Sequence, residues 1–474
     1  MPVNRYIDTV TIIKDQPLNP ELPLYRRIAE AISAALSTGA IATHVKLPPM
    51  RHLADELKVT VGTVKRAYDE LEKRGLLKCT VGDGCYTQAP NTRVTADFLN
   101  ALEDDSADDC IDLAHNAHIL DPSALTLFAQ ALQNLAQDPQ RMAKIHQYSP
   151  EVGLLSHRQA ATAWLKLSQV DCRADQIMIT NGAQHGLFCA LATLCRYGDS
   201  IAAEHLSYPG LMMAARTLGL RLHGLAMDEQ GLIPEALLAL LQKHKLQVLY
   251  LNPTIHNPTT LTMPTTRRQA LADICHDHGI TIIQDEALGV LTDTQHPSFA
   301  TLLPDATLTL SCLSKAISPG LRIGYVAAPL ALVPRLAASI RANCWMASPL
   351  SIDIATQWLN DGTLFRLRAQ QRAIIAHRLA LAKPLLGDLD YASHPDCAHV
   401  WLELPEPWRA DEAQATLAQH NILVSTAESF AIGRLPTPPR IRVSLSGSAH
   451  ETDVMTGIRT VQQVLQQPLS SHRP

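Results

Sequence analysis

Four short apolar runs of the chain, each typical of a buried strand, are followed by polar residues. These runs and the polar residues after them are Gln176–Thr180 with Asn181 to Gln184, Gln247–Leu251 with Asn252 and Asn257, Ile280–Gln284 with Asp285, and Thr307–Leu310 with Lys315. In a parallel sheet the carboxyl ends of the strands meet at one edge, and ligands bind there. We therefore expect these side chains to form one site.

The residue types at this edge fit the cofactor pyridoxal 5′-phosphate. The amine of Lys315 can condense with the aldehyde to form a Schiff base. A carboxylate such as Asp285 can keep the pyridine nitrogen protonated, so that the ring acts as an electron sink. The amide of Asn257 can donate a hydrogen bond to the phenolic oxygen of the ring.

The phosphate of this cofactor requires the amides of a helix N-terminus together with a cation. The turn Gly182-Ala183-Gln184 opens a predicted helix and supplies amides, so Ala183 and Gln184 are candidate phosphate ligands. Arg322, seven residues after Lys315, supplies a guanidinium that can bind a phosphate with two hydrogen bonds.

In their order and spacing these motifs resemble fold-type I aminotransferases, and in particular the aminotransferase-like half of MocR regulators. The resemblance covers about residues 111 to 465 and rests on YSPEVGLLSHRQA, HLSYPG, NPTIHNPT, IIQDE, SCLSKAISPGLRIGY and RIRVSLSG. It implies a homodimer in which Tyr148 reaches the phosphate of the neighbouring subunit, and it places Tyr208 where a ring stacks on the cofactor. It also implies that Arg442 clamps the carboxylate of a substrate or effector, with Arg440 as its competitor.

The chain departs from the family at positions around the expected Schiff base. Ala287 and Leu288 stand where a tyrosine is common, and Cys312 stands where Ser or Thr often binds the phosphate. Ser311 or Ser314 can compensate for Cys312. These changes favour cofactor binding without sustained turnover, and they leave a residual transaminase activity open.

Residues 21–88 have the pattern of three helices and a hairpin, which is a winged helix-turn-helix. The expected helices are LPLYRRIAEAISAALSTGAI, LPPMRHLADELKV and TVGTVKRAYDELEKRG, and the hairpin turns at Gly82-Asp83-Gly84. The segment resembles the GntR family of bacterial regulators. It holds 10 Lys and Arg against 8 Asp and Glu, in a chain of net charge −5. This distribution fits contact with double-stranded DNA confined to the N-terminus.

Five residues of this segment are candidate DNA contacts. Arg51, Lys65 and Arg66 carry cations that can bind phosphates, and Thr60 and Thr63 stand at the start of the recognition helix. The family often has Ser-Arg where this chain has Thr60-Val61, so the operator sequence is not carried over. A helical protein-binding module is the alternative to a DNA-binding domain.

The length of 474 residues and the 46% of apolar residues predict a chain of several well-packed domains. We expect an arm at 1–20, the winged helix at 21–88, a linker at 89–110 and an aminotransferase-like domain at 111–474. The last is an α/β domain with a mostly parallel sheet and a smaller α+β subdomain that begins near Leu332.

The remaining features concern the cellular environment and metals. No signal peptide or membrane-spanning run is visible, so we expect a cytoplasmic protein. The ten cysteines lack a CxxC pair, and reduced thiols are favoured over a disulfide framework. We expect no metal site at Cys275, His276 and His278, because no second ligand pair follows them at zinc spacing.

Three functions follow from these patterns. The favoured one is a DNA-binding transcriptional regulator that senses pyridoxal phosphate or a small amino compound through its aminotransferase-like domain. The second is an active aminotransferase that carries a winged-helix domain. The third is a DNA-binding protein in which the aminotransferase fold serves as a dimerisation scaffold without cofactor.

Overall fold

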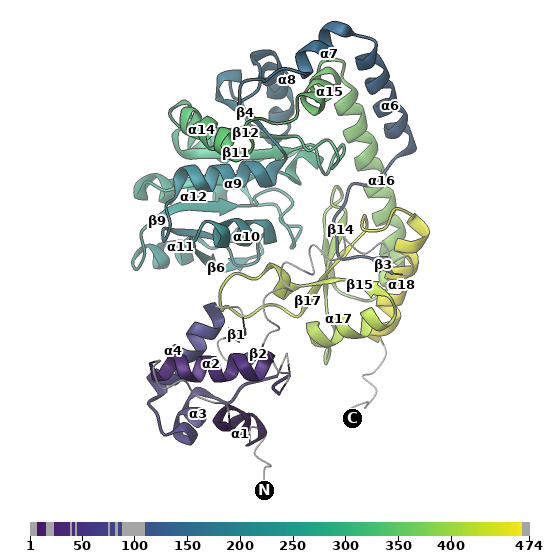
Figure 1. Cartoon of the computed structure of the whole chain (residues 1–474). Helices are drawn as coiled ribbons and strands as arrows, with labels where there is room; N and C mark the ends of the chain where they lie inside the picture. Colours follow the sequence, from purple (N-terminus) through teal and green to yellow (C-terminus); the bar gives the residue numbers. More distant parts are fainter. Residues whose placement is uncertain are drawn as a thin grey trace. The chain divides into compact units, whose positions relative to one another are not determined.

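The computed structural model describes residues 7–15, 23–37, 40–42, 45–73, 76–80, 84–87 and 110–466. The chain divides into two units (Figure 1). One unit comprises Met1–Asp108 and Arg434–Pro436, and the other comprises Asp109–Gly433 and Thr437–Pro474. Within the described residues, no helix is both long and apolar enough to span a membrane.

The N-terminal unit is a set of helices followed by a hairpin. Its elements are α1 (Ile7–Asp15), α2 (Leu24–Ser37), α3 (Met50–Leu57), α4 (Val61–Lys73), β1 (Leu77–Thr80) and β2 (Gly84–Thr87). Helix α3 ends at Leu57, its C-cap Lys58 has a φ of 54° that turns the chain sharply, and α4 begins three residues after this cap. This short turn is the helix-turn-helix that the sequence predicts.

Two features of this unit differ from the expectation. The first twenty residues are not only an arm, because α1 packs Val10 and Ile13 into the core of the unit. The expectation of reduced thiols is wrong for one pair: Cys79 on β1 and Cys85 on β2 form a disulfide. They lie directly opposite each other in the antiparallel register of the hairpin.

The larger unit is built on a sheet of seven strands in the order β4-β12-β11-β10-β9-β5-β6. The bounds of these strands are β4 (Ile177–Thr180), β5 (Ser200–Glu204), β6 (Arg221–Leu225), β9 (Leu246–Leu251), β10 (Thr281–Asp285), β11 (Thr307–Cys312) and β12 (Gly324–Ala327). Only β12 runs antiparallel to its neighbours, so the remaining pairs are parallel. The carboxyl ends of β4, β9, β10 and β11 therefore share one edge.

Helices cover both faces of this sheet, as the alternation of buried side chains along the strands requires. On β9, Tyr250 packs with residues of α9 and α10, whereas Leu249 packs on the opposite face with residues of α11 and α12. The helices of this part are α6 (Pro122–Ala136), α7 (Pro139–Ile145), α8 (Leu155–Leu165), α9 (Ala183–Leu194), α10 (Pro209–Thr217), α11 (Pro234–Leu241), α12 (Thr265–His278), α13 (Phe299–Leu302), α14 (Val333–Cys344) and α15 (Pro349–Asn360). Two short strands, β7 (Met227–Asp228) and β8 (Gly231–Leu232), form a separate hairpin.

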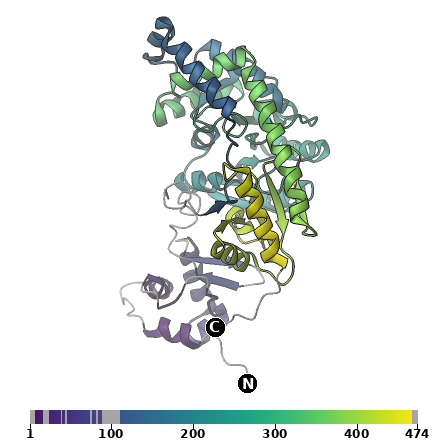
Figure 2. The same ribbon diagram turned by 90° about the vertical axis from the view of Figure 1, so that its right-hand side faces the viewer.

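The C-terminal part forms a second, antiparallel sheet in the order β13-β14-β17-β16. Its elements are α16 (Thr363–Leu386), β13 (Tyr391–Ser393), β14 (His399–Glu403), α17 (Ala410–Gln419), β15 (Ile422–Leu423), β16 (Ser425–Thr426), β17 (Arg440–Ser444) and α18 (Glu451–Gln466). Helices α16 and α18 lie side by side (Figures 1 and 2). Strand β3 (Ile111–Asp112), far away in sequence, pairs with β15 and so joins this subdomain.

Candidate functional site

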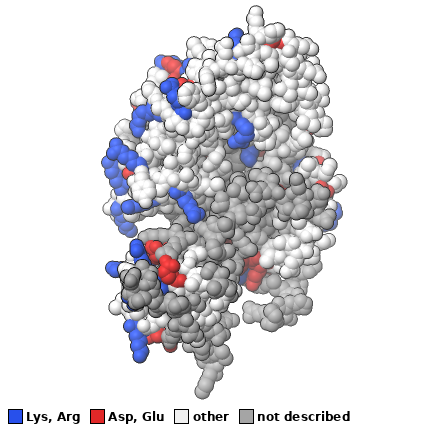
Figure 3. All heavy atoms as spheres, viewed as in Figure 1, with Lys and Arg blue, Asp and Glu red and all other residues white. Residues whose placement is uncertain are grey.

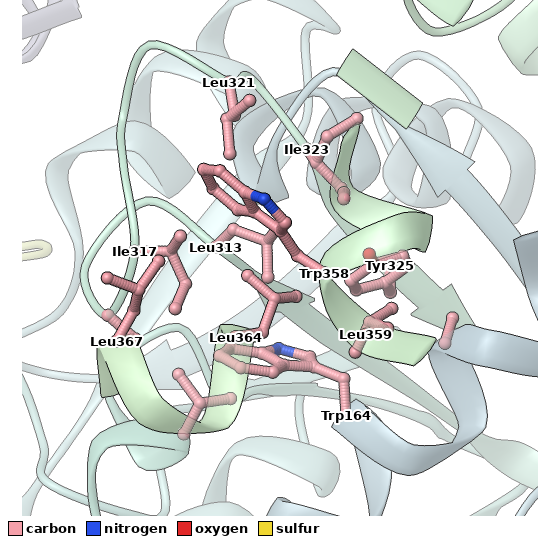
Figure 4. Close-up of a cluster of buried hydrophobic side chains, with 14 of the residues drawn as sticks. Trp164, Leu313, Ile317, Leu321, Ile323, Tyr325, Trp358, Leu359, Leu364 and Leu367 are labelled. Atoms are coloured by element: carbon pink, nitrogen blue, oxygen red, sulfur yellow. The ribbon is translucent and has the colours of Figure 1, made fainter. Parts of the chain in front are cut away.

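Lys315 lies in the turn that follows β11, and apolar packing fixes this turn. Leu313, Ile317 and Leu321 are buried in the cluster that contains Trp164 and Trp358 (Figure 4). The indole of Trp164 also donates a 3.1 Å hydrogen bond to Ser311 Oγ at the end of β11. A lysine between buried residues of so short a segment has little freedom to move its backbone.

The amine of Lys315 faces the other polar residues of the sheet edge. Its Nζ donates a 2.6 Å hydrogen bond to the carbonyl oxygen of Asn116. Burial lowers the pKa of Lys315, and the cations of Arg442 and Arg322 lower it further, while the acidic groups of Cys312 and Asp285 oppose them. A lowered pKa increases the fraction of neutral amine, which is the nucleophilic form.

Asp285 ends β10 at the same edge and is only 5% exposed. Its Oδ2 accepts a 2.6 Å hydrogen bond from the phenol of Tyr250, and its Oδ1 accepts one of 2.9 Å from the amide of Ala287. Burial raises the pKa of Asp285, and the hydrogen bonds from Tyr250 and Ala287 and the charge of Lys315 act in the opposite direction.

Asn252 connects the ends of three segments beneath the site. Its side-chain amide donates to the carbonyl of Asp285 at 3.0 Å, and its oxygen accepts from the backbone amide of Asn257 at 3.2 Å. Its own backbone amide donates to Glu204 Oε2 on β5 at 3.1 Å. Burial raises the pKa of Glu204 to about 8. These bonds position Asp285 and Asn257 relative to each other.

The N-terminus of α9 and Arg322 form the side of the site that suits an anion. Gly182 precedes α9 with a φ of 83°, and the helix begins at Ala183. The guanidinium of Arg322 donates a 3.1 Å hydrogen bond to the carbonyl of Asn181. A Cβ at Gly182 would stand 2.7 Å from Arg322 Nη2, so the glycine lets the cation lie against the helix start. Gln184 donates to the carbonyl of Gly210 at 3.0 Å, which joins this turn to α10.

Tyr208, Cys312 and Ser314 lie near the charged groups of the site. Burial raises the pKa of Tyr208, and the negative charges of Asp285 and Cys312 raise it further, while Arg322 opposes them. Burial also raises the pKa of the Cys312 thiol, which Ser314 counteracts by hydrogen bonding. Tyr208 and Cys312 both lie close enough to Asp285 for its charge to raise their pKa values.

Arg442 and Arg440 lie two residues apart on β17 and have different partners. Arg442 is 7% exposed, lies over the ring of Phe430 at 4.7 Å, and donates a 2.7 Å hydrogen bond to Asn257 Oδ1. It also donates to the carbonyl of Ala114. Arg440 instead forms an ion pair with Glu403. The structure thus brings Arg442, but not Arg440, to Asn257.

Tyr148 lies on the surface of the chain. Its side chain is 82% exposed and packs against Trp345, with a distance of 5.5 Å between ring centroids. Within one chain, Tyr148 therefore does not join the group around Lys315.

Several buried polar atoms around Lys315 find no hydrogen-bond partner within the described part of the chain. They are Asn116 Oδ1, His118 Nε2, Gln184 Oε1 and Arg442 Nε. Such atoms are costly unless a bound molecule supplies the missing partners. Arg442 Nε is a donor and, together with the Arg322 cation at the helix start and the Lys315 amine, fits an anionic ligand such as pyridoxal phosphate. The oxygen atoms of Asn116 and Gln184 are acceptors and need donor groups instead.

The recognition helix α4 belongs to the N-terminal unit. Thr60 Oγ1 accepts a 3.2 Å hydrogen bond from the amide of Thr63 and lies 2.9 Å from the Thr63 hydroxyl, so these two threonines cap the start of α4. Arg51, Lys65 and Arg66 are exposed. Figure 3 shows Lys and Arg as well as Asp and Glu side chains on the described surface of this unit.

Two family models match the chain. Residues 108–456 match the model described as aminotransferase class I and II, and residues 24–87 match that of the bacterial regulatory proteins of the gntR family. The chain belongs to the class I and II aminotransferase family. With its GntR helix-turn-helix domain it is a MocR-type regulator, and the cofactor of its larger domain is pyridoxal 5′-phosphate.

Relatives named as transcriptional regulators align with this chain over most of their length. The uncharacterized HTH-type transcriptional regulator YdeF of Bacillus subtilis is 26% identical over 98% of this chain and 99% of its own. The HTH-type pyridoxine biosynthesis transcriptional regulator PdxR of Corynebacterium glutamicum is 28% identical over 78% of this chain and 81% of its own.

Solved structures of aminotransferases share the fold of the larger unit. An archaeal alanine:glyoxylate aminotransferase has a TM-score of 0.69 at 22% identity, and covers 79% of this chain with 95% of its own. The α-aminoadipate aminotransferase LysN of Thermus thermophilus has a TM-score of 0.68 at 20% identity, and covers 79% of this chain with 95% of its own. The expected fold class is therefore confirmed.

Sequence reasoning missed the residues that surround Lys315 from outside the main motifs. Tyr250, Asn116, His118 and His399 were not expected at the site. For Tyr250 a signal was present, since a tyrosine inside the buried run QVLYL needs a partner for its hydroxyl. Asn116 and His118 come from the segment that follows β3, and nothing in their spacing indicated a contact with a lysine almost 200 positions away.

Proposed function

We propose that this MocR-type protein changes its binding to double-stranded DNA when its larger domain binds pyridoxal phosphate or the adduct of that cofactor with a small amino compound. The observation that carries the proposal is that Arg442 of β17 and Asp285 of β10 both lie close enough to act on Lys315 at the edge of the seven-stranded sheet, in a chain that also has a GntR domain. A ligand can regulate DNA binding only if it binds the two conformations of the protein with different affinity.

Each site residue has a part in this proposal. Lys315 is the covalent anchor, and Asp285 balances the charge of the pyridine nitrogen. Asn257 binds the phenolic oxygen, and Tyr208 lies against the ring. When bound, the cofactor supplies an aldehyde for Schiff-base chemistry and a ring that can accept electrons.

In this proposal the phosphate is bound by the amides at the start of α9 and by the cation of Arg322. The amides of Ala183 and Gln184, the hydroxyl of Ser314 and the guanidinium of Arg322 are its ligands, and Tyr148 reaches it from the second subunit of a homodimer. The 82% exposure of Tyr148 supports this role, because an aromatic side chain on the surface is available to a partner. Arg442 holds the carboxylate of the effector.

The regulator is favoured over an efficient aminotransferase by the surroundings of Asp285. Ala287 and Leu288 provide no phenol where the family commonly has one. That phenol would act on the phenolic oxygen of the cofactor, and Tyr250 on the neighbouring strand does not replace it, because its hydroxyl donates to Asp285, the carboxylate proposed to face the ring nitrogen. Sustained transamination is therefore not expected, although a half-reaction on an amino compound fits the site. We place the protein in the cytoplasm, where DNA and the cofactor are present.

The cofactor is tested by the visible absorption spectrum of the purified protein, with and without added pyridoxal phosphate. We expect a Schiff-base band in the parent protein that is absent in Lys315→Ala. Absence of the band from the parent in excess cofactor would overturn the cofactor role, and the scaffold function would then be the better description.

The regulatory role is tested by titrating the protein into DNA from upstream of the gene that encodes it. The titration is done with and without the cofactor and with a panel of amino compounds. We expect the apparent Kd for DNA to change several-fold with ligand in the parent and to stay constant in Lys315→Ala. Binding should weaken steeply with salt, and Lys65→Ala and Arg66→Ala should each reduce the slope of log K against log salt by about 1. A flat salt response would contradict the DNA contacts, and a ligand-independent Kd would contradict the regulation.

A further inference from the structure

Two residues of the segment from Ala114 to His118 contact Lys315. The carbonyl of Asn116 accepts the hydrogen bond from Lys315 Nζ at 2.6 Å, and Nδ1 of His118 lies 3.3 Å from the carbonyl oxygen of Lys315. Asn116 and His118 therefore contact the lysine that the proposed function makes the anchor. Neither residue has a part in holding the cofactor as described above.

The hydrogen bonds of Asn116 fix the direction in which its amide faces. Its Nδ2 lies 2.6 Å from His399 Nδ1, and His399 Nε2 lies 3.0 Å from the carbonyl oxygen of Pro258. A carbonyl can only accept, so Nε2 of His399 carries the proton. Burial holds the pKa of His399 well below its usual value, and the cation of Arg442 lowers it further, so the ring is neutral and Nδ1 is an acceptor. Asn116 must therefore donate through Nδ2, which leaves Oδ1 as a buried acceptor.

The hydrogen bond of His118 likewise fixes which of its ring nitrogens carries the proton. The carbonyl of Lys315 can only accept, so Nδ1 of His118 carries the proton. Burial lowers the pKa of His118, so the ring is neutral and its Nε2 is an acceptor. In the described part of the chain, neither Nε2 of His118 nor Oδ1 of Asn116 has a hydrogen-bond partner.

Arg442, in contrast, lacks an acceptor for one of its donor atoms. Its two terminal nitrogens are engaged by Asn257 and Ala114, but its Nε is a buried donor with no partner among the described residues. The site therefore lacks an acceptor at Arg442 and lacks donors at Asn116 and His118. A carboxylate satisfies the first need, and an N–H or O–H group satisfies the second.

We propose that Asn116 and His118 determine the specificity of the effector site by selecting an α-amino acid whose side chain carries a hydroxyl or ammonium donor. This inference rests on the proposed function, since it assumes that an amino compound binds beside Lys315. The two acceptors also disfavour side chains that end in a carboxylate, because acceptors facing each other repel and neither is solvated.

The test compares pairs of amino acids that differ only in the presence of the donor. L-Serine is compared with L-2-aminobutyrate, L-homoserine with L-norvaline, and L-ornithine with L-norleucine, because the members of each pair have nearly the same shape. Binding to the full-length protein loaded with pyridoxal phosphate is followed by the absorbance change of the bound cofactor. In at least one pair we expect the donor to bind about 10-fold tighter or more, as a site with buried polar groups requires. L-Glutamate should bind more weakly than the preferred donor.

Variants show whether Asn116 and His118 cause the preference. Asn116→Leu and His118→Phe should each bring the ratio of the two Kd values in the preferred pair towards 1, with a smaller effect on the Kd of the apolar member. His118→Gln keeps an acceptor and should retain part of the ratio. His115→Leu is the matched control, because His115 belongs to the same segment but contacts Asp112. This control should leave the ratio unchanged.

A second readout separates failure of this inference from failure of the proposed function. The same pairs are compared by the shift in thermal unfolding temperature, which needs no coloured cofactor. Equal Kd values and equal thermal shifts within every pair overturn the specificity role of Asn116 and His118, even if the Schiff-base band forms. A missing band overturns the cofactor role, and the thermal shifts then still show whether a donor is preferred.

Discussion

Tyr250 on β9 donates a 2.6 Å hydrogen bond to Asp285 on the neighbouring strand β10. The bond lowers the pKa of Asp285 against the larger opposing effect of burial. Burial raises the pKa of Tyr250, so the phenol stays protonated and remains a donor. The carboxylate that is expected to face the cofactor ring is thus supported by a side chain from inside the sheet.

The first prediction concerns this bond. Tyr250→Phe removes a hydrogen bond to a charged group, and we expect the affinity for pyridoxal phosphate to fall about 10-fold. The ionised form of Asp285 holds the protonated ring, so cofactor binding is lost as the pH falls through the pKa of Asp285. Without the phenol this pKa is higher, and the loss should begin at a higher pH. The measurement is the Kd for the cofactor as a function of pH, and identical profiles in parent and variant would contradict the prediction.

The second prediction concerns the start of α9. Gly182→Ala places a Cβ 2.7 Å from Arg322 Nη2 and forces a side chain on a backbone with a φ of 83°. We expect the cofactor affinity to fall at least 10-fold, because Arg322 and the first amides of α9 can no longer face one phosphate. Gly279→Ala is the control: its φ is 62°, but its Cβ would meet nothing within 4 Å. Both variants should lose stability in a thermal melt, and only the first should lose the cofactor.

The third prediction distinguishes the two arginines of β17. Arg442→Met should weaken the binding of a carboxylate-bearing effector about 10- to 100-fold, because a charged hydrogen-bond donor is removed. Arg440→Met should leave this binding within about twofold, since Arg440 pairs with Glu403. Titration of the bound cofactor's spectrum with an amino acid and with the corresponding amine measures the effect. A larger loss in Arg440→Met than in Arg442→Met would reverse the assignment.

The fourth prediction concerns the charge of Lys315. Its neutral amine is the form that reacts with an aldehyde, and burial and the cations of Arg442 and Arg322 lower its pKa. The rate at which the apoprotein acquires the Schiff-base band should therefore rise as the pH rises through this pKa. In Arg442→Met one of the cations is absent, the pKa is higher, and the rise should shift to higher pH. A stopped-flow series in pH gives both profiles, and coincident curves would count against the electrostatic explanation.

The fifth prediction concerns the hairpin of the N-terminal unit. The Cys79–Cys85 disulfide closes a loop with a sequence separation of 6, which stabilises the folded unit by about 2 kcal/mol through loop-closure entropy. We expect Cys79→Ser to lower its unfolding temperature by on the order of 10 °C. A reducing agent should do the same to the parent and nothing further to the variant. Cys172→Ser, which changes a free thiol, serves as the control in calorimetry.

The strands of the sheet could be predicted from the sequence because they are short apolar runs that are followed by polar residues. The expected strand at Gln247–Leu251 is β9 at Leu246–Leu251, and the one at Ile280–Gln284 is β10 at Thr281–Asp285. The places of the candidate cofactor-binding residues could then be predicted as well, because these residues lie at or after the ends of the strands. The direction of a strand has no such local signal, and the antiparallel β12 became clear only from its pairing.

Local sequence patterns do not predict contacts between segments that are distant in the chain. Strand β3 pairs with β15 through two residues of each, which is too short for a periodic signal. Helix α1 was missed because its few apolar residues form a helix only by packing on the rest of the unit. Cys79 and Cys85 flank the predicted turn at Gly82-Asp83-Gly84, but a pair that faces across a hairpin leaves no CxxC motif in the sequence.

The segment after β3 contacts both residues that the ligand is expected to bind. The carbonyl of Ala114 binds Arg442 and the carbonyl of Asn116, two residues later, binds Lys315. A carboxylate that takes Arg442 and an aldehyde that takes Lys315 each compete with one of these carbonyls. Occupation of the site would therefore release two anchors of a stretch that begins within a few residues of the predicted linker. Ligands at Lys315 and Arg442 would thus act on the same short stretch of backbone, at the start of the larger unit.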